Sequence, residues 1–188
     1  KSGEEITLEK DCVYDVWQDN CLRLTGYHCS NTATYAENPL GERFSAVHIK
    51  NLNGVTVNGK QVSHIGQGLL IFLGIAKNDT AAQADFLAKK AANLRIFEDE
   101  NKKMNLSVQD IKGEVLVVSQ FTLAGDPSRG NRPGFETAAA PQDADVLYEY
   151  FSEQLRSVHH LPVQNGIFQA DMQVELLNDG PVTFMLEK

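Results

Sequence analysis

The sequence has few cysteines, no long apolar run and no excess of positive charge. Its three cysteines, Cys12, Cys21 and Cys29, all precede residue 30, so the rest of the chain must fold without disulfides. The longest apolar run, from Leu69 to Ala76, is too short to span a bilayer, and the first residues lack the apolar segment of a signal peptide. We therefore expect a soluble, cytoplasmic protein that does not associate with a membrane.

The sequence also lacks the common metal and nucleotide motifs. His28 lies beside Cys29, but the cysteine spacing matches no common zinc pattern, and ordinary reduced thiols are the favoured interpretation. There is no phosphate loop and no Gly-x-Ser-x-Gly elbow. A net charge of −8 argues against a broad electrostatic surface for nucleic acid, so any RNA or DNA contact must be local. We expect no metal and no cofactor.

The length of 188 residues and the hydrophobic content of 42% suit one domain with a core of its own. Residues 1–43 show no sustained period and contain Asn38-Pro39 and Gly41. A regular pattern begins at Phe44. We therefore predict an N-terminal extension of unknown role over residues 1–43 and a domain over residues 44–188.

Strands are predicted in the first half of that domain. Residues 44–50 resemble a strand, and residues 54–62 predict a hairpin, because Asn58-Gly59 tolerates the positive φ values of a type I′ turn. Residues 68–76 read as the central strand of a sheet.

Two helices are predicted, and further strands close the chain. Residues 78–80 offer N-cap oxygens to a helix over 81–95, and Pro141 begins a second helix whose apolar residues recur at helical spacing up to Val158. Residues 171–177 and 182–186 are predicted strands around a turn. Helices between groups of strands indicate the α+β class.

The strand that organises these elements is Val115–Val118, whose four apolar residues predict burial on both faces. Polar side chains follow at its end, where Ser119, Gln120 and Thr122 offer hydroxyl and amide groups and Phe121 offers a face for a base or ring. Local backbone hydrogen bonds and core packing are the ordinary alternative for such residues.

Gly180-Pro181 is a second candidate segment. A prolyl bond can be cis, and glycine leaves nearby carbonyl oxygens uncovered, so the turn could present backbone oxygens to a ligand or simply join two strands. A serine-hydrolase triad is not indicated, because all five histidines fall outside the polar segments.

Three motifs together resemble the signature segments of the D-aminoacyl-tRNA deacylases, also called D-tyrosyl-tRNA deacylases. They are Ser119-Gln120-Phe121-Thr122-Leu123, Gly130-Asn131-Arg132-Pro133-Gly134-Phe135 and Asn178-Asp179-Gly180-Pro181-Val182-Thr183. Shorter matches include Leu94–Phe97 and Asp171–Val174, and the resemblance covers about residues 44–188.

The resemblance implies a homodimer with mixed, largely antiparallel sheets in a barrel-like core and two main helices. It implies hydrolysis of the ester that links a D-amino acid, or misplaced glycine, to the terminal adenosine of tRNA. Gly180-Pro181 would be a cis pair that one protomer inserts into the pocket of the other. Its carbonyl oxygens would repel an L side chain and leave a D side chain free.

The resemblance also implies roles for single residues. The catalytic residues would be Ser119, Gln120, Phe121 and Thr122. Gln120, Phe121 and Thr122 would shape the pocket and hold the adenosine, and Ser119 would orient them. Substrate binding would involve a further set of residues: Asn178, Thr183, Gly180, Pro181 and Met172. Two mechanisms of hydrolysis are open. Thr122 could act as the nucleophile, or the 2′-hydroxyl group of the substrate could assist an attacking water. We favour the second mechanism, because Thr122 has no recognisable base.

The resemblance has departures. Ala46-Val47-His48-Ile49-Lys50 is about one residue short of the usual first strand and has Lys50 where arginine is usual. Residues 1–43 have no counterpart in the family. They could be a tRNA-binding arm, a targeting remnant or a mispredicted exon. The alternatives to an editing hydrolase are a catalytically silent nucleic-acid or partner-binding protein on the same fold and a conventional esterase of small esters.

Overall fold

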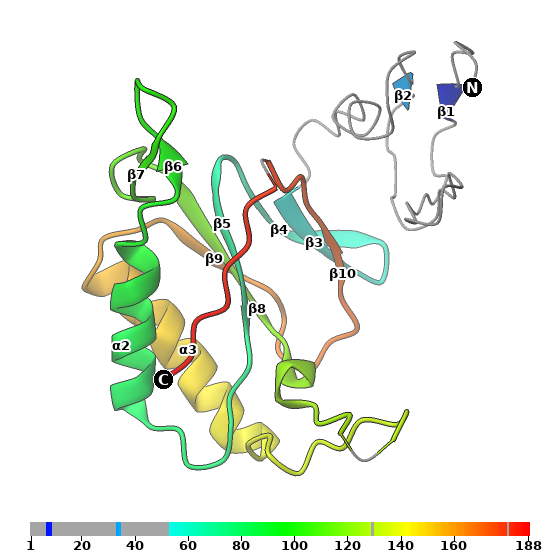
Figure 1. The fold of residues 1–188 in the computed structure, drawn as a ribbon. Helices are drawn as coiled ribbons and strands as arrows, with labels where there is room; N and C mark the ends of the chain where they lie inside the picture. The colour runs from blue at the N-terminus through cyan, green and yellow to red at the C-terminus, as the bar shows by residue number, and fades with distance from the viewer. Residues whose placement is uncertain (1–6, 9–32, 35–52, 129, 180) are drawn as a thin grey trace. The chain divides into compact units, whose positions relative to one another are not determined.

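The computed structural model describes residues 7–8, 33–34, 53–128, 130–179 and 181–188 (Figure 1). The chain divides into two compact units, Lys1–Leu52 with Glu175–Leu177, and Asn53–Val174 with Asn178–Lys188. In the first unit, β1 (Thr7–Leu8) pairs with β2 (Ala33–Thr34) in antiparallel orientation. The predicted strand over 44–50, Lys50 and the three cysteines lie outside the described residues, and the domain boundary at residue 44 stays a prediction.

The hairpin predicted over residues 54–62 is confirmed. Strands β3 (Asn53–Val57) and β4 (Lys60–Ile65) are antiparallel, and the two residues between them, Asn58 and Gly59, have φ values of 50° and 74°. These are the positive angles that a type I′ turn requires. Strand β10 (Gln173–Glu175) lies on the other side of β3 in the same sheet.

A second sheet has the order β5-β8-β9, with both pairings parallel. It contains β5 (Gly68–Leu73), β8 (Glu114–Ser119) and β9 (Val163–Asn165). Residues Val115–Val118 of β8 are at most 1% exposed, which confirms the prediction of a strand buried on both faces. The prediction that residues 68–76 form the central strand is wrong for the described part of the sheet. There, β8 is the middle strand and β5 is an edge strand.

Both predicted helices are confirmed and cover one face of this sheet (Figure 1). Helix α2 (Ala81–Ala92) begins with a capping box between Thr80 and Gln83 and ends earlier than predicted. Helix α3 (Pro141–Ser157) has proline in its first turn, and its buried face includes Tyr148. These helices pack against Val115 and Val117 of β8, whereas Leu116 and Val118 pack toward the β3-β4 hairpin.

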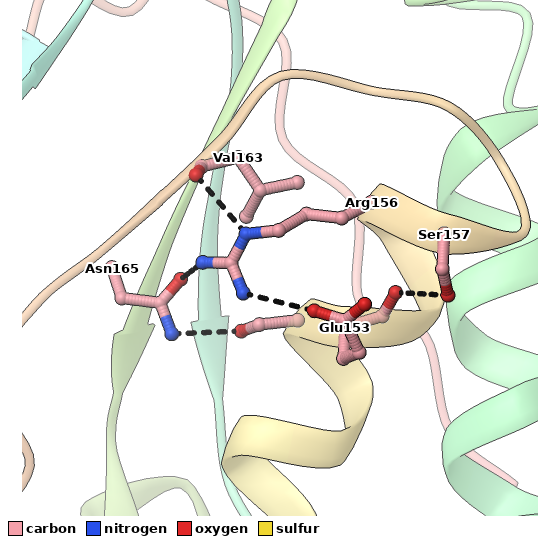
Figure 2. A network of polar contacts seen from close by, with 6 residues as sticks. Glu153, Arg156, Ser157, Val163 and Asn165 are labelled. Carbon is pink, nitrogen blue, oxygen red and sulfur yellow. Dashed lines mark hydrogen bonds and ion pairs between the residues drawn. The ribbon is translucent and has the colours of Figure 1, made fainter.

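Polar contacts fix α3 to β9 (Figure 2). Arg156 donates from Nε to the Val163 carbonyl oxygen at 3.4 Å and from Nη2 to Asn165 Oδ1 at 2.8 Å. Asn165 donates in turn to the hydroxyl of the buried Ser152 at 3.0 Å, and Arg156 forms an ion pair with Glu153 at 3.7 Å. Strand β9 was not predicted from the sequence, because it is only three residues long and follows a proline.

The C-terminal strand predicted over Val182–Leu186 is wrong. Residues 181–188 are described and form no strand. The apolar pattern of these residues was the only sequence signal for a strand. In the structure, no described strand pairs with them, and Phe184 and Met185 are exposed. The strand predicted over residues 171–177 is present in shortened form as β10.

The α+β class is confirmed, with two helices and mixed sheets. A short antiparallel pair, β6 (Phe97–Glu98) and β7 (Met104–Leu106), completes the strands. The described strands form four separate sheets and no closed barrel. Within the described residues, no helix is long and apolar enough to cross a membrane.

Candidate functional site

The polar segment after β8 lies at the end of the parallel sheet. Ser119 is the last residue of β8, and Gln120 precedes the 3₁₀ helix η1 (Phe121–Ala124). The Gln120 N–H donates to the Leu73 carbonyl oxygen at 2.8 Å. Because the carboxyl ends of β5 and β8 meet at this edge, the segment is held on a rigid base, as expected from the sequence.

Two of the predicted catalytic side chains contact each other. The Gln120 side-chain amide donates a hydrogen bond to the Thr122 hydroxyl, and Thr122 is exposed. An amide N–H group gives a hydrogen bond and cannot take a proton from the hydroxyl. This contact therefore orients Thr122 and does not activate it as a nucleophile.

Phe121 lies against the loop that carries the second motif. The Phe121 and Phe135 ring centroids are 5.0 Å apart at an interplanar angle of 59°. The Phe121 and Phe135 side chains are 60% and 37% exposed, so the pair forms an aromatic surface open to solvent. Phe135 is the last residue of the second motif but was not among the predicted site residues.

Backbone contacts fold this loop back onto η1. Asp126 and Gly134 exchange two hydrogen bonds of 2.8 and 2.9 Å, and the Thr137 hydroxyl donates to the Ala124 carbonyl oxygen at 2.6 Å. The Ser128 hydroxyl and N–H group both donate to the Asp126 carboxylate and lower the pKa of that carboxyl.

In the third motif, Asn178 contacts the two described residues that follow Pro181. The Asn178 side chain accepts from the Val182 N–H group at 2.9 Å and donates to the Thr183 hydroxyl at 2.9 Å. Pro181 and Thr183 are exposed, and Gly180 lies outside the described residues. The predicted substrate-binding residues Asn178 and Thr183 are thus brought together around the Gly-Pro step.

Among the described residues, the segment Ser119–Thr122 and the segment that contains Asn178 and Thr183 do not meet. Figure 1 shows η1 beyond the carboxyl end of β8, whereas the red trace directly after β10 lies toward the end of the sheet where β5 begins. Because β5 and β8 are parallel, these are opposite ends of one sheet. A site that uses both segments therefore needs one of them from another molecule.

Met172 is half-buried and packs on the apolar cluster of Val55, Ile65, Leu116 and Val118. Its sulfur also lies close to Gly166, where a Cβ atom on that glycine would meet it at 2.7 Å. This packing places Met172 on the side of β8 that faces the β3-β4 hairpin. Its predicted role in substrate binding stays a prediction.

Tyr148 is a buried residue that was not selected from the sequence. It is 1% exposed, and its hydroxyl donates to the Val117 carbonyl oxygen at 2.8 Å. Burial raises the pKa of the Tyr148 phenol above its ordinary value, so it stays protonated and remains a hydrogen-bond donor. Tyr148 precedes Phe151 by three residues and Leu155 by seven, and this helical spacing could have indicated that it lies on the buried face of α3.

Among the described residues, no group of three or more His, Cys, Asp and Glu side chains could hold a metal ion. The described histidines are His64 on β4, which is exposed, and His159 and His160 just after α3.

The amino-acid sequence is similar to that of known bacterial proteins. A family model described as "D-Tyr-tRNA(Tyr) deacylase" matches residues 51–187. The D-aminoacyl-tRNA deacylase of Geotalea daltonii is 59% identical over 133 residues, which cover 71% of this chain and 88% of that protein. The protein of the same name from Thermodesulfovibrio yellowstonii is 53% identical over 136 residues, covering 72% and 92%.

Solved structures show the same similarity in the fold. The structure of a "c-Myc DNA Unwinding Element Binding Protein" superposes with a TM-score of 0.68 at 42% identity, covering 74% of this chain and 95% of that one. The structure of "a probable eukaryotic D-amino acid tRNA deacylase" gives a TM-score of 0.51 at 18% identity, covering 67% and 90%. At that identity the second likeness supports the fold alone.

Proposed function

This chain belongs to the D-aminoacyl-tRNA deacylase family, and we propose how its own residues carry out the family's reaction. The protein is an ester hydrolase that acts on D-aminoacyl-tRNA. Water is added across the ester, and the products are free D-amino acid and tRNA with its terminal hydroxyl restored. We extend the substrates to tRNA mischarged with glycine, and we place the enzyme in the cytoplasm, where tRNA is used.

The pocket for the terminal adenosine lies at the carboxyl end of β8. Gln120, Phe121 and Thr122 line it, and Ser119 holds the segment at the end of the strand. The exposed aromatic pair of Phe121 and Phe135 supports this assignment, because an adenine ring gains free energy by stacking on an aromatic face. With a net charge of −8, the protein needs such local contacts to hold an RNA end.

Selectivity for the D enantiomer comes from the Gly180-Pro181 turn. Its backbone carbonyl oxygens face the α-carbon of the substrate, so an L side chain would be driven into uncompensated polar atoms. A D side chain points away from them, and glycine has no side chain to exclude. The two hydrogen bonds of Asn178 to Val182 and Thr183 support this role, because they tie the residues on either side of the turn together.

The turn is supplied by a second copy of the chain, so the working enzyme is a homodimer. The separation of η1 from the segment after β10 within one chain is the observation that carries this proposal (Figure 1). Exposed apolar side chains on the edge strand β5 and on the C-terminal segment, Phe72, Phe184 and Met185, supply surface that a second copy would cover. The barrel-like core implied by the resemblance would then be completed across the two copies.

Hydrolysis uses the substrate's own 2′-hydroxyl to assist the attacking water. The hydrogen bond that Gln120 donates to Thr122 supports this mechanism, because the amide group that contacts the threonine hydroxyl cannot take its proton. The protein then contributes orientation of the ester, which is worth several orders of magnitude in rate.

The test is deacylation of D-Tyr-tRNA and L-Tyr-tRNA side by side. We expect rapid loss of the D ester alone from the full chain, and the same from a version beginning at Phe44 if the domain starts there. Hydrolysis of neither ester by a well-folded dimer would overturn the assignment. Sedimentation of the protein in solution tests the dimer separately.

A second candidate function is DNA binding, because the 42% identical solved structure is that of a protein named for binding a DNA element. The acidic net charge disfavours it. Binding to duplex DNA at 0.15 M salt that persists with the deacylase site mutated would favour this function, and no retention of DNA would exclude it.

A further inference from the structure

Tyr148 joins the two strands that lead into the candidate site. Its hydroxyl donates to the Val117 carbonyl oxygen at 2.8 Å and lies 3.4 Å from the Gly166 carbonyl oxygen. Val117 is in β8, two residues before Ser119, and Gly166 directly follows β9. One buried hydroxyl group from α3 therefore contacts both strands close to their carboxyl ends.

The Val117 carbonyl oxygen has a second donor. The Gly166 N–H group also donates to it at 2.8 Å, so both lone pairs of this buried oxygen are used. The two donors fix the position of the peptide group that immediately precedes Val118 and the polar segment. A shift at this peptide group would be passed along the chain to Gln120 and η1, because only Val118 and Ser119 of the same strand intervene.

Gly166 connects the same junction to Met172. The sulfur of Met172 lies so close to Gly166 that a Cβ atom there would meet it at 2.7 Å. Moving Gly166 therefore moves the packing of Met172, which is one of the predicted substrate-binding residues. The Tyr148 ring itself packs on Phe168, with ring centroids 5.8 Å apart.

The rest of α3 is anchored independently of this hydroxyl group. The contacts of Ser152 and Arg156 with Asn165 hold the helix to β9 about one and two turns further along (Figure 2). Replacing Tyr148 by phenylalanine would keep its ring and this network and would remove only the hydrogen bonds to the strand ends. The fold is thus expected to survive the change.

We propose that Tyr148 is a positioning residue for deacylation, which sets the place of the Ser119–Thr122 segment through the Val117 and Gly166 peptide groups. This proposal rests on the proposed location of the site at the end of β8. Tyr148 is buried and contacts neither substrate nor solvent, so its effect is on geometry and not on proton transfer.

The test compares Tyr148→Phe with Tyr150→Phe in the whole 188-residue chain. Tyr150 is on the same helix, and its hydroxyl donates to Asp85 of α2 at 2.9 Å, so the control loses an equivalent group away from the site. At a temperature where both variants are fully folded, we expect kcat for D-Tyr-tRNA to fall about tenfold in Tyr148→Phe, with KM within about twofold. Tyr150→Phe keeps the wild-type kcat.

Amide hydrogen exchange gives a second readout that does not depend on activity. We expect faster exchange in residues 119–125 of Tyr148→Phe and unchanged exchange there in Tyr150→Phe. The pH dependence of kcat keeps its shape. Equal kcat in the two variants, unchanged exchange in residues 119–125, or a shifted pH profile that shows the phenol acting as an acid would each overturn the proposal.

Gln120→Ala, assayed in parallel, separates this proposal from the location of the site. If Gln120→Ala deacylates at the wild-type rate, the site is not at the end of β8. If Gln120→Ala is impaired and Tyr148→Phe is not, the site stands and only the role of Tyr148 is refuted.

Discussion

The Phe121 ring on η1 lies 5.0 Å from the Phe135 ring, which comes from the loop that follows η1. The 59° angle between the rings gives a tilted pair, and each ring keeps a large exposed area. Two signature segments that are separate in the sequence thus form one aromatic surface beside Gln120 and Thr122. This surface is where we place the base at the end of the tRNA.

Replacing Phe121 by alanine should weaken substrate binding. Stacking of a base on an aromatic side chain contributes about 1–3 kcal/mol, so we expect KM for D-aminoacyl-tRNA to rise by about 5- to 150-fold. Steady-state deacylation kinetics measure it. Phe86→Ala is the matched control, since Phe86 is also exposed but is on α2, and it should leave KM unchanged. An unchanged KM in Phe121→Ala would remove Phe121 from the binding surface.

Replacing Thr122 by alanine should leave substantial activity. The Thr122 hydroxyl accepts a hydrogen bond from Gln120, and no base bonded to it is seen among the described residues, so we expect kcat to fall by no more than about tenfold, as for the loss of one orienting contact. Single-turnover deacylation of D-Tyr-tRNA measures the chemical step. Near-complete inactivity in a folded variant would instead identify Thr122 as the nucleophile and refute assistance by the 2′-hydroxyl group.

The main elements were predictable because their signals are local. Four consecutive apolar residues sufficed for β8, Asn58-Gly59 for the hairpin, and Pro141 with helical spacing for α3. Strand β9 is three residues long and is stabilised by side-chain contacts of Arg156 on α3 with Val163 and Asn165, which no apolar pattern in the sequence indicates. The prediction of a strand over residues 182–186 was wrong for a different reason. The apolar pattern of a strand is present there, but no described strand pairs with these residues.

The candidate site also has features that could be predicted from the sequence and features that could not. Residues of each motif could be selected from the sequence, and the structure brings Gln120 next to Thr122 and Asn178 next to Thr183. The contact of Phe121 with Phe135 depends on how the intervening loop folds back, and the role of Tyr148 depends on a contact across 31 residues. Neither follows from spacing. That the two motif groups lie at opposite ends of one sheet also required the structure.

Replacing Asn178 by alanine should reduce discrimination between D and L esters. The change removes both the acceptor for the Val182 N–H group and the donor to the Thr183 hydroxyl, so the turn at Gly180-Pro181 loses its support. We expect the ratio of kcat/KM values for D-Tyr-tRNA and L-Tyr-tRNA to fall about tenfold. The ratio is measured with both esters in one preparation.

Asn178→Asp is the control for this change. Its carboxylate still accepts from the Val182 N–H group, and the Thr183 hydroxyl can rotate and donate to it, so most of the discrimination should remain. If the alanine and aspartate variants discriminate as well as the wild type, Asn178 does not support the selective turn.

Acid should weaken the loop after η1 through Asp126. The Ser128 hydroxyl and N–H group hold the pKa of the Asp126 carboxyl below its ordinary value of 3.8. The contribution to stability is therefore fully present above about pH 3.8 and is lost as the pH falls through the lower pKa of the folded state. Ser128→Ala removes the hydroxyl donor, so the free energy of unfolding should depend less steeply on pH below 3.8. Urea unfolding across this range measures the slope, and identical slopes would contradict the assignment.

Ser63→Ala should stabilise the protein. Ser63 is on β4 and only 5% exposed, and its Oγ atom has no hydrogen-bond partner among the described residues. A buried hydroxyl group without a partner costs about 1–3 kcal/mol of desolvation free energy, so its removal should raise the free energy of unfolding by about 1 kcal/mol.

Ser107→Ala is the matched control for Ser63→Ala, because Ser107 is 6% exposed and its hydroxyl donates to the Asp110 carboxylate at 2.7 Å. Loss of this charge-assisted bond should lower the free energy of unfolding, the opposite sign from the Ser63 change. Urea unfolding at pH 7 measures both variants under one condition. A loss of stability in Ser63→Ala as large as that in Ser107→Ala would mean that the Ser63 hydroxyl has a bonding partner in the folded protein.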